Sequence, residues 1–276
     1  MIHKKTVAVT LIALLLFFST EAYALQNQEA SSEYKLNKQF LGSFVHDFNQ
    51  VVSAPKDWNK TDLVKLSAFV ASGTLIFIFD EDIYSWVQKR KSPTSDDIFR
   101  FSNSLGHGIF LGSSITALYI TGEIFDDVRL RQIALLGLES WIITGVIVAG
   151  MKFMIGRARP CQEETSTTFH PFSFSTRYRS FPSGHASSAF ALATTIADHS
   201  DKFIVDALAY SLAVLAGIAR VHEEKHWASD VFIGAVLGHF ISKKISAWHK
   251  REKTQRIQVG FHCLPQKQSF TLSFRF

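Results

Sequence analysis

Long apolar segments, separated by short polar connectors, constrain this sequence of 276 residues more than any other feature. The whole sequence has only six prolines, and apolar runs of this length without breakers favour helices over strands. We therefore expect an all-α fold, a bundle of about six core helices. The core segments are expected at Leu66 to Phe79, Ile109 to Ile120, Ile133 to Ile155, Ala186 to Ala197, Ile204 to Ala219 and Val231 to Ile241.

The flanks of this helical domain, which we place at residues 61–247, differ from it in composition. Residues 25–60 are mostly polar and are expected to form a peripheral N-terminal arm. Residues 248–276 begin with a basic segment and then partly alternate apolar with polar residues around Pro265. Alternation around a proline-containing turn predicts two short strands, which would form a β-hairpin tail.

The N-terminus, residues 1–24, has the features of a secretory signal peptide. Two lysines precede an apolar run from Val7 to Phe18, and Ala22-Tyr23-Ala24 supplies a small-residue cleavage site. An uncleaved membrane anchor is the alternative, although the run is shorter than the ~20 residues that a span needs. In both cases the chain from Leu25 onward is expected to leave the cytoplasm.

The composition is compatible with two arrangements of the apolar helices, one embedded in the membrane and one soluble in the periplasm. Mean hydropathy is only +0.10, and 19% of the residues are charged. If all six segments crossed the membrane, the basic stretch at residues 243–256 would end outside, against the usual cytoplasmic placement of positive charge. The conflict disappears if an early segment, the one that ends in Phe79-Asp80-Glu81-Asp82, does not cross, or if no segment crosses.

The formal net charge of +5 comes largely from the same basic stretch at residues 243–256. Few aromatic residues are interleaved with these cations and the chain is expected to be exported, so nucleic acid is not an expected partner. A solvated helix end or an anionic lipid surface explains the charge better.

The two cysteines, Cys161 and Cys263, lie far apart in the sequence. One disulfide could form between them in an oxidising compartment, but the sequence does not require it. Neither cysteine has the spacing of a structural zinc site.

The first chemical motif is KFMIGRARP, in which Lys152 precedes Arg159 and Pro160. If the segment is helical, the seven-residue spacing of Lys152 and Arg159 corresponds to about two turns and places both cations on one face near the helix end. Such a pair could hold a multiply charged anion. Two interfacial cations that flank an apolar helix are the alternative reading.

The second motif is Ser183-Gly184-His185, which directly follows Pro182 and opens an apolar segment. A helix that begins here offers free backbone N–H groups to an anion. Ser183 can cap the helix or bind phosphate, and His185 adds a titratable proton. A simple helix cap would need no more than the serine.

The third motif is ARVHEEKHWASD, which contains Arg220, His226 and Asp230. Four residues separate His226 from Asp230, so a helix would place them on one face. The carboxylate could then accept the Nδ1 proton and leave Nε2 as a free nucleophile.

In this order the three motifs resemble the signature of the type 2 phosphatidic acid phosphatase and vanadium haloperoxidase superfamily. That signature is Lys, six residues, Arg-Pro; then Pro-Ser-Gly-His; then Ser-Arg, five residues, His, three residues, Asp. This sequence departs from it only at Ala219, where the family usually has serine. The resemblance covers Leu105 to Phe240 and does not extend to the arm or the tail.

The resemblance implies a phosphatase that needs no metal or other cofactor. His226 would attack phosphorus, His185 would protonate the leaving group and later activate water, and Asp230 would orient His226. The phosphate would be held by Lys152, Arg159, Ser183, Gly184 and Arg220.

The expected substrate is a lipid phosphate or diphosphate, such as a phosphatidate-type lipid, undecaprenyl diphosphate or a lipid A phosphate. The expected location is the inner membrane with the site facing the periplasm. A soluble periplasmic nonspecific acid phosphatase is the main alternative, and a vanadium-dependent haloperoxidase is a remoter one.

His222 to His226 also reads HEEKH, the pattern of a zinc protease. That reading would leave the first two motifs unexplained, so we expect it to be a coincidence. The remaining histidines outside the signal peptide are expected to be structural or exposed: His46, His107, His170, His199, His239, His249 and His262.

Overall fold

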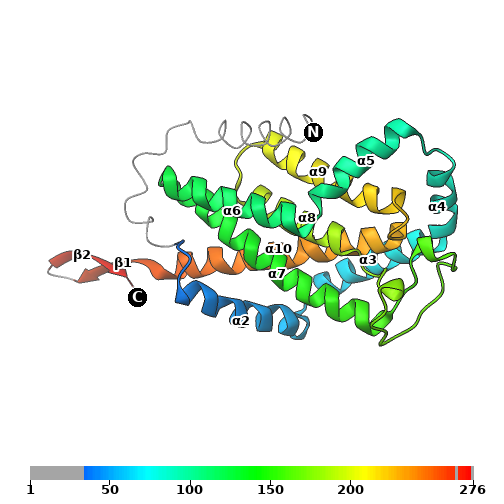
Figure 1. Cartoon of the computed structure of the whole chain (residues 1–276). Helices are drawn as coiled ribbons and strands as arrows, with labels where there is room; N and C mark the ends of the chain where they lie inside the picture. Colours follow the sequence, from blue (N-terminus) through cyan, green and yellow to red (C-terminus); the bar gives the residue numbers. More distant parts are fainter. Residues whose placement is uncertain (1–33, 265–266, 275–276) are drawn as a thin grey trace.

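The computed structural model describes residues 34–264 and 267–274, with side chains up to Lys250, and these residues form a helical bundle with a two-stranded tail (Figure 1). The expected all-α fold with a strand-like tail is therefore confirmed. The helices are α2 (Lys38–Ser53), α3 (Lys60–Ile78), α4 (Asp80–Gln88), α5 (Pro93–Leu105), α6 (Gly108–Ile124), α7 (Val128–Ile155), α8 (Gly184–His199), α9 (Phe203–His222) and α10 (Ala228–Arg256). The predicted signal peptide lies outside the described residues.

All six predicted apolar segments lie within helices, namely α3 and α6 to α10. The sequence analysis did not predict α2, α4 or α5, because these helices are less apolar or short. Their ends nevertheless carry clear local signals. Ser92 caps α5 with a reciprocal capping box, and Asn37 caps α2 by accepting a hydrogen bond from the Phe40 N–H.

Helix α8 lies at the centre of the bundle and packs against α7, α9 and α10. Its small side chains allow the neighbouring backbones to come close. The closest approach is at Gly238 of α10, where an added Cβ would lie 2.1 Å from the carbonyl oxygen of Ser187. Backbone contact of this kind fixes α10 against α8, and the second and third motifs at the starts of these helices are fixed with it.

A long connection, residues 156–183, links α7 to α8 and folds back over the end of the bundle. Gly156 ends α7 in the left-handed conformation with φ of 61°, and an added Cβ would lie 1.8 Å from the His170 carbonyl oxygen. The connection is also tied to the α9–α10 turn, since the Cys161 N–H donates to the Glu224 carbonyl oxygen over 3.0 Å. The connection that follows the first motif therefore meets the third motif at this end.

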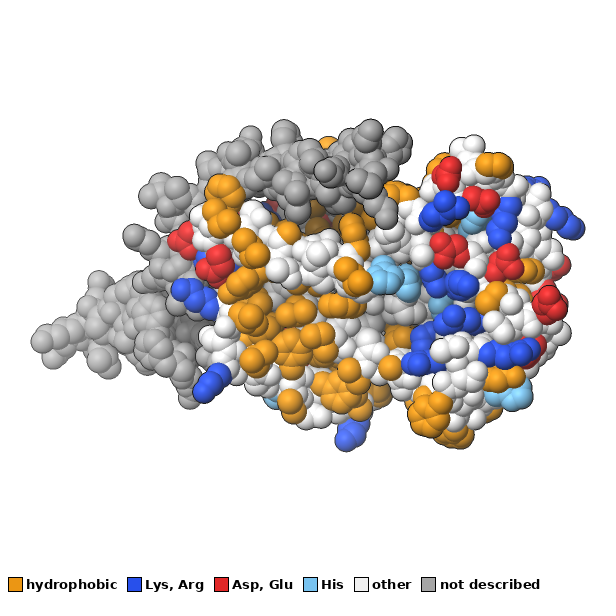
Figure 2. Space-filling view, viewed as in Figure 1, with side chains coloured by type: hydrophobic (Ala, Val, Ile, Leu, Met, Phe, Trp, Pro, Cys, Tyr) orange, Lys and Arg blue, Asp and Glu red, His pale blue; other side chains and the backbone are white. Residues whose placement is uncertain are grey.

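Among the described residues, three helices, α3, α7 and α9, are long and apolar enough to cross a membrane. Only 6% of the apolar window of α3 is buried inside the bundle, against 56% for α7. Hydrophobic side chains also cover the middle of the face over α6 and α7 (Figure 2). The outer surface of the bundle thus suits contact with lipid.

The tail consists of β1 (Ile257–Leu264) and β2 (Lys267–Phe274), which pair antiparallel with Ile257 opposite Phe274. Helix α10 continues to Arg256, so the basic stretch at residues 243–256 extends the last core helix. The side chain of Cys263 lies outside the described ones, and its pairing with Cys161 stays a hypothesis.

Candidate active site

The second motif begins a helix as the sequence predicts. Ser183 is the N-cap of α8, and its Oγ accepts a hydrogen bond from the Ala186 N–H over 3.4 Å. The Ser183 N–H in turn donates to the Asp230 carbonyl oxygen over 2.9 Å. This bond joins the start of α8 to the start of α10, and so fixes Gly184 and His185 relative to the third motif.

The predicted helical placement of Lys152 and Arg159 is wrong. Helix α7 ends at Ile155, and Gly156 turns the chain away, so Arg159 lies in the connection that follows. Lys152 stays in the last turn of α7 and donates from Nζ to the carbonyl oxygens of Arg179, over 2.7 Å, and Ser180, over 3.2 Å. The two cations therefore reach the site from separate elements.

The shared helical face predicted for His226 and Asp230 is also wrong. Helix α9 ends at His222 and α10 begins at Ala228, so His226 lies in the turn between them. The turn still brings the pair together, with His226 Nδ1 3.9 Å from Asp230 Oδ2. This distance exceeds a hydrogen bond, and Nδ1 has no hydrogen-bond partner among the described residues. Nδ1 is the ring nitrogen nearest the carboxylate, which leaves Nε2 as the candidate nucleophile.

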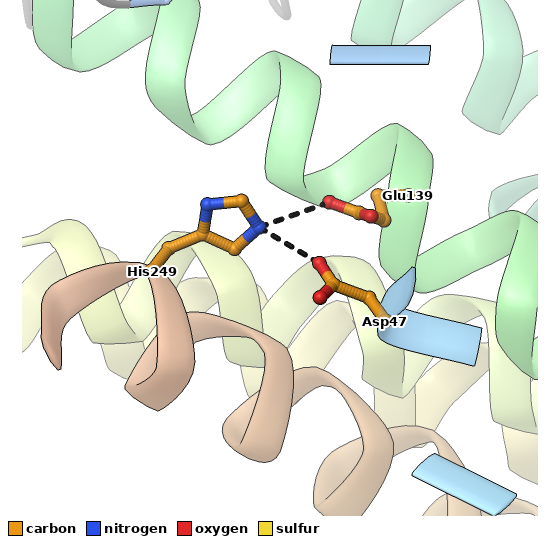
Figure 3. A group of neighbouring side chains, drawn as sticks. All are labelled: Asp47, Glu139 and His249. Carbon is orange, nitrogen blue, oxygen red and sulfur yellow. Dashed lines mark hydrogen bonds and ion pairs between the residues drawn. The ribbon is translucent and has the colours of Figure 1, made fainter. Parts of the chain in front are cut away.

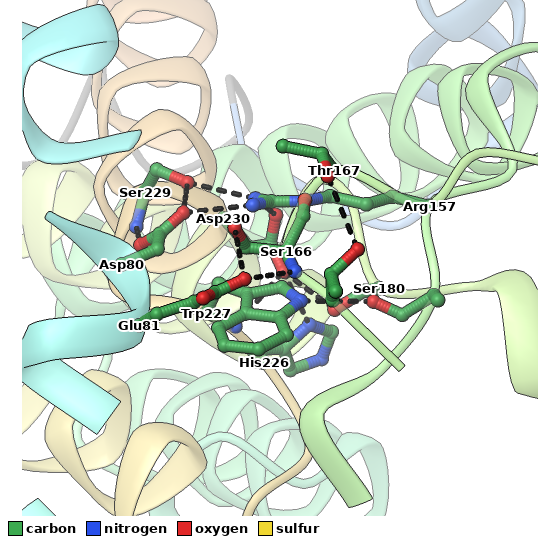
Figure 4. A network of polar contacts seen from close by, with 12 residues as sticks. Asp80, Glu81, Arg157, Ser166, Thr167, Ser180, His226, Trp227, Ser229 and Asp230 are labelled. Atoms are coloured by element: carbon green, nitrogen blue, oxygen red, sulfur yellow. Dashed lines mark hydrogen bonds and ion pairs between the residues drawn. The ribbon is translucent and has the colours of Figure 1, made fainter. Parts of the chain in front are cut away.

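Asp230 is fully buried and is held by contacts from the α7–α8 connection and from the α9–α10 turn (Figure 4). Its Oδ2 accepts hydrogen bonds from Ser180 Oγ over 2.5 Å and from the Trp227 N–H over 2.9 Å. Its Oδ1 accepts from Arg157 Nη1 over 2.7 Å. Burial alone would raise the pKa of Asp230, but the contacts with His226, Arg157 and Ser180 hold it below its usual value. Asp230 is therefore a fixed negative charge beside His226.

Arg157 connects Asp230 to a second buried carboxylate, Asp80 at the start of α4. Arg157 Nη2 donates to Asp80 Oδ2 over 2.8 Å, and both side chains are fully buried. The Ser229 N–H also donates to Asp80 Oδ1 over 2.9 Å. The network thus links α4, the α7–α8 connection and the start of α10 behind the histidine.

Two guanidinium groups near the site have buried donors without a protein partner. Nε of Arg159 and Nε of Arg220 form no hydrogen bond. Arg220 is otherwise positioned by Asn103 and by Glu223, whose Oε2 lies 3.0 Å from Nη1. Buried donors left unsatisfied are costly unless a ligand accepts from them. An anion with several oxygens would satisfy both.

The electrostatic environment keeps both candidate catalytic histidines neutral. Burial lowers the pKa of His226 to about 3, and the charges of Lys152 and Arg220 act in the same direction against Asp230. Burial likewise lowers the pKa of His185 to about 3, with Arg220 adding to the effect. A neutral imidazole at His226 is the form that can act as a nucleophile. A bound anion would favour the protonated form of His185.

A cleft of about 250 Å³ opens beside these residues. Its polar side includes Lys152, Arg179 and His185. The remainder is lined by small or apolar residues of α7, by the start of α8, and by the turn between α5 and α6 with the first residue of α6: Gly145, Val148, Ala149, Gly184, Ser187, Ser188, Gly106 and Gly108. The ring of His107, which we expected to be structural or exposed, lies 5.9 Å from the ring of His185. In Figure 2, Lys and Arg side chains gather at the end of the molecule next to the hydrophobic face.

The geometry of the HEEKH sequence does not match a zinc protease helix. Helix α9 ends at His222, so His222 and His226 do not share a helical face. His222 Nε2 instead lies 3.2 Å from Ser95 Oγ and 3.4 Å from Asp96 Oδ1.

The sequence analysis missed four residues that the structure brings to the site or behind it: Asp80, Arg157, Arg179 and Ser180. Arg157 lies inside the first motif, but only its neighbours Lys152 and Arg159 were assigned a role. The sequence analysis considered Asp80 only as one of three acidic residues at the end of an apolar segment that need not cross the membrane. It did not predict a contact between Asp80 and Arg157. A pair so distant in sequence has no local signal.

These features define a class of protein: a helical bundle that collects cations and free N–H groups for an oxyanion beside a buried histidine–aspartate pair. A model of the PAP2 superfamily matches residues 134–254. Residues 134–254 are thus similar to the type 2 phosphatidic acid phosphatase family, whose signature the three motifs resemble.

Curated relatives are similar to part of this chain. A probable lipid phosphate phosphatase 4 of Arabidopsis thaliana is 32% identical over 40% of this chain and 45% of its own length. A lipid A 1-phosphatase of Porphyromonas gingivalis is 33% identical over 37% of this chain and 20% of its own length. The chain thus spans less than half the length of these two relatives.

One solved structure with a similar fold is that of the first transmembrane PAP2 type phosphatidylglycerolphosphate phosphatase from Bacillus subtilis. It is 20% identical, with a TM-score of 0.50, and the match covers 67% of this chain and 96% of that one. At this identity the likeness supports the fold.

Proposed function

We propose that this protein is a metal-independent phosphatase that hydrolyses a lipid phosphate or diphosphate through a phosphohistidine at His226. The observation that carries the proposal is the pair of buried Nε donors, on Arg159 and Arg220, that lack a partner beside the neutral imidazole. Lys152 and the N-terminal N–H groups of α8 complete the cradle. Cations and dipoles arranged in advance can stabilise the transition state of phosphoryl transfer without a metal.

In the first step, Nε2 of His226 attacks phosphorus while the bond from phosphorus to the leaving oxygen breaks. His185, protonated when the anion binds, gives its proton to the leaving alkoxide or phosphate. The imidazole becomes cationic on phosphorylation, and the fixed charge of Asp230 stabilises it.

In the second step, water attacks the phosphohistidine. His185, now neutral, takes a proton from the water as the bond from nitrogen to phosphorus breaks. Inorganic phosphate leaves, His226 returns to its neutral form and His185 regains its proton. The cycle consumes one water and needs no redox or metal partner.

Two observations favour a lipid substrate over a soluble ester. The cleft beside Lys152 and His185 continues along Gly145, Val148 and Ala149, small or apolar residues of α7 that leave room for a chain. Val146 of the same helix is exposed, at 52%, and hydrophobic side chains cover the adjoining face (Figure 2). A lipid could therefore lie along α7 with its phosphate in the cradle. The names of the curated relatives support the same substrate class.

We place the protein in the inner membrane with the site facing the periplasm. The predicted signal peptide and the three apolar helices support this location.

The test measures phosphate release by the full-length protein, in the presence of EDTA, from lipid phosphates in detergent micelles and from a soluble aryl phosphate. We expect metal-independent turnover with preference for the lipid. Preference for the soluble ester would favour the nonspecific acid phosphatase. Loss of activity in EDTA, with the fold intact by circular dichroism, would contradict the mechanism.

A further inference from the structure

A second group of titratable side chains lies in the bundle away from the phosphate site. Asp47 of α2, Glu139 of α7 and His249 of α10 point toward one another between the three helices (Figure 3). Glu139 precedes Lys152 by 13 residues on α7, which is about 20 Å along the helix axis. The proposed phosphatase chemistry makes no use of this group.

Both carboxylates approach the same ring nitrogen. His249 Nε2 lies 2.9 Å from Asp47 Oδ2 and 3.3 Å from Glu139 Oε2. Because Nε2 carries at most one proton, it can make a well-aligned hydrogen bond to only one of these oxygens. Glu139 Oε2 is the atom left without a hydrogen-bond partner, and the side chain of Glu139 is fully buried.

Burial makes this arrangement of two carboxylates and one imidazole energetically unfavourable when a proton is the only cation between them. Glu139 is 0% exposed and Asp47 is 3% exposed. Two ionised carboxylates around one imidazolium would carry a net negative charge in the bundle interior, where an unbalanced charge is costly and is removed either by protonation of a carboxylate or by a bound cation. Ser43 Oγ, 3.5 Å from Glu139 Oε1, is at the limit of a hydrogen bond and offers little compensation. A divalent cation would balance two carboxylates and a neutral imidazole.

We propose that Asp47, Glu139 and His249 bind a divalent transition-metal ion, with Zn²⁺ the best match, and that the ion fastens α2 and the end of α10 to α7. The three ligand atoms lie within 4.8 Å of one another. Zinc bonds to nitrogen and carboxylate oxygen are about 2.0–2.2 Å long, so ligands of one tetrahedral ion lie about 3.4 Å apart. To reach that geometry, the distances of 2.9 and 3.3 Å from Nε2 to the carboxylate oxygens must widen, and the two carboxylate oxygens must move toward each other.

The ligand set selects the kind of ion. One imidazole nitrogen with two carboxylate oxygens suits zinc or manganese better than the softer ions that prefer thiolates. Water completes the coordination on the side of His249, whose side chain is 17% exposed. The ion satisfies Glu139 Oε2 and removes the excess negative charge in one step.

The site is tested by calorimetric titration of ZnCl₂ into the chelator-stripped full-length protein in detergent, with metal content measured by elemental analysis. The wild type is expected to bind one equivalent, with a higher melting temperature in zinc. Glu139→Gln keeps the side-chain volume and is expected to weaken zinc binding about 100-fold. Loss of a direct ligand should cost at least as much affinity as loss of a residue that only contacts a ligand. If Glu139→Gln does not fold, His249→Gln serves as the second variant, because it removes the ligand that is partly exposed.

The matched control is His46→Gln, which removes an exposed histidine next to Asp47. This variant is expected to bind zinc as the wild type does. The proposal is wrong if the wild type binds no stoichiometric zinc, or if Glu139→Gln or His249→Gln, once folded, binds it equally well. The inactive variant His226→Ala is expected to retain zinc binding, so the result does not depend on the phosphatase proposal.

Discussion

Arg157 Nη1 lies 2.7 Å from Asp230 Oδ1, and neither side chain is exposed to solvent. The guanidinium also holds Asp80, so one cation contacts two buried carboxylates. Arg157 does not line the cleft but fixes the carboxylate that faces His226. We regard Arg157 and Asp80 as positioning residues for the proposed nucleophile.

Replacement of Arg157 by methionine is expected to destabilise the fold strongly. Arg157→Met leaves two buried carboxylates without their cation, and breaking a buried pair in this way costs about 3–5 kcal/mol. The free energy of unfolding, measured with denaturant in detergent, reports the loss. The control is Arg177→Met, which breaks a partly exposed pair with Glu164 and should cost about 0–1 kcal/mol. Equal losses in the two variants would contradict the role of the network.

The two histidines should have separable effects on the phosphoenzyme. His226→Ala removes the nucleophile and should abolish both turnover and acid-labile phosphoryl label. His185→Gln should slow turnover by about 10²–10⁴, the usual contribution of a general acid–base group, while label can still form on His226. Rapid-quench labelling with a radioactive phosphate ester measures both quantities. Label on His226→Ala would show that another residue accepts the phosphoryl group.

Stability should fall on acidification partly because of His226. Its pKa is lowered from 6.5 to about 3 in the folded protein, so between these values the unfolded chain binds more protons than the folded one. The contribution of His226 to the free energy of unfolding is therefore fully present above the pKa of the unfolded state. It is lost as the pH falls toward the pKa of the folded state. We expect the free energy of unfolding to fall less between about pH 7 and about pH 4.5 in His226→Gln than in the wild type, as measured by denaturant unfolding at both pH values. Identical losses would mean that His226 does not titrate in this way.

A large side chain in place of Gly145 should reduce activity on the lipid much more than activity on a soluble substrate. Gly145 lines the cleft, and a Cβ there would meet nothing within 4 Å. Gly145→Phe should therefore occupy the cleft without distorting α7. We expect kcat/KM for the lipid to fall at least about 10-fold, a loss of about 1.4 kcal/mol, with a much smaller change for a small aryl phosphate. A parallel loss on both substrates would place the lipid elsewhere.

Helix packing at Gly238 gives a stability test that is independent of the chemistry. Gly238→Ala forces a Cβ to within 2.1 Å of the Ser187 carbonyl oxygen, and such overpacking typically costs about 1–3 kcal/mol. At Gly150 of α7 nothing lies within 4 Å of the added Cβ. Gly150→Ala should therefore stabilise the helix by up to about 1 kcal/mol. Thermal unfolding of the two variants gives the comparison.

The sequence by itself determined the helical class, the six apolar core helices and the identity of the signature residues. Apolar periodicity and scarce proline are local properties, and a helix satisfies its own backbone hydrogen bonds, so both can be read without tertiary contacts. The start of α8 at Ser183 was predictable for the same reason, since a cap is encoded within a few residues. The strand-like tail followed from simple alternation.

Only the tertiary structure decided how the site is assembled. Sequence spacing predicted that Lys152 and Arg159 share one helical face and that His226 and Asp230 share another. Neither pair does, because α7 ends before Gly156 and α9 ends at His222. The contacts of Asp80 with Arg157, and of Asp47 with Glu139 and His249, join residues far apart in the sequence. Such contacts depend on how helices pack, and packing is set by the three-dimensional fit of side chains that no local pattern records.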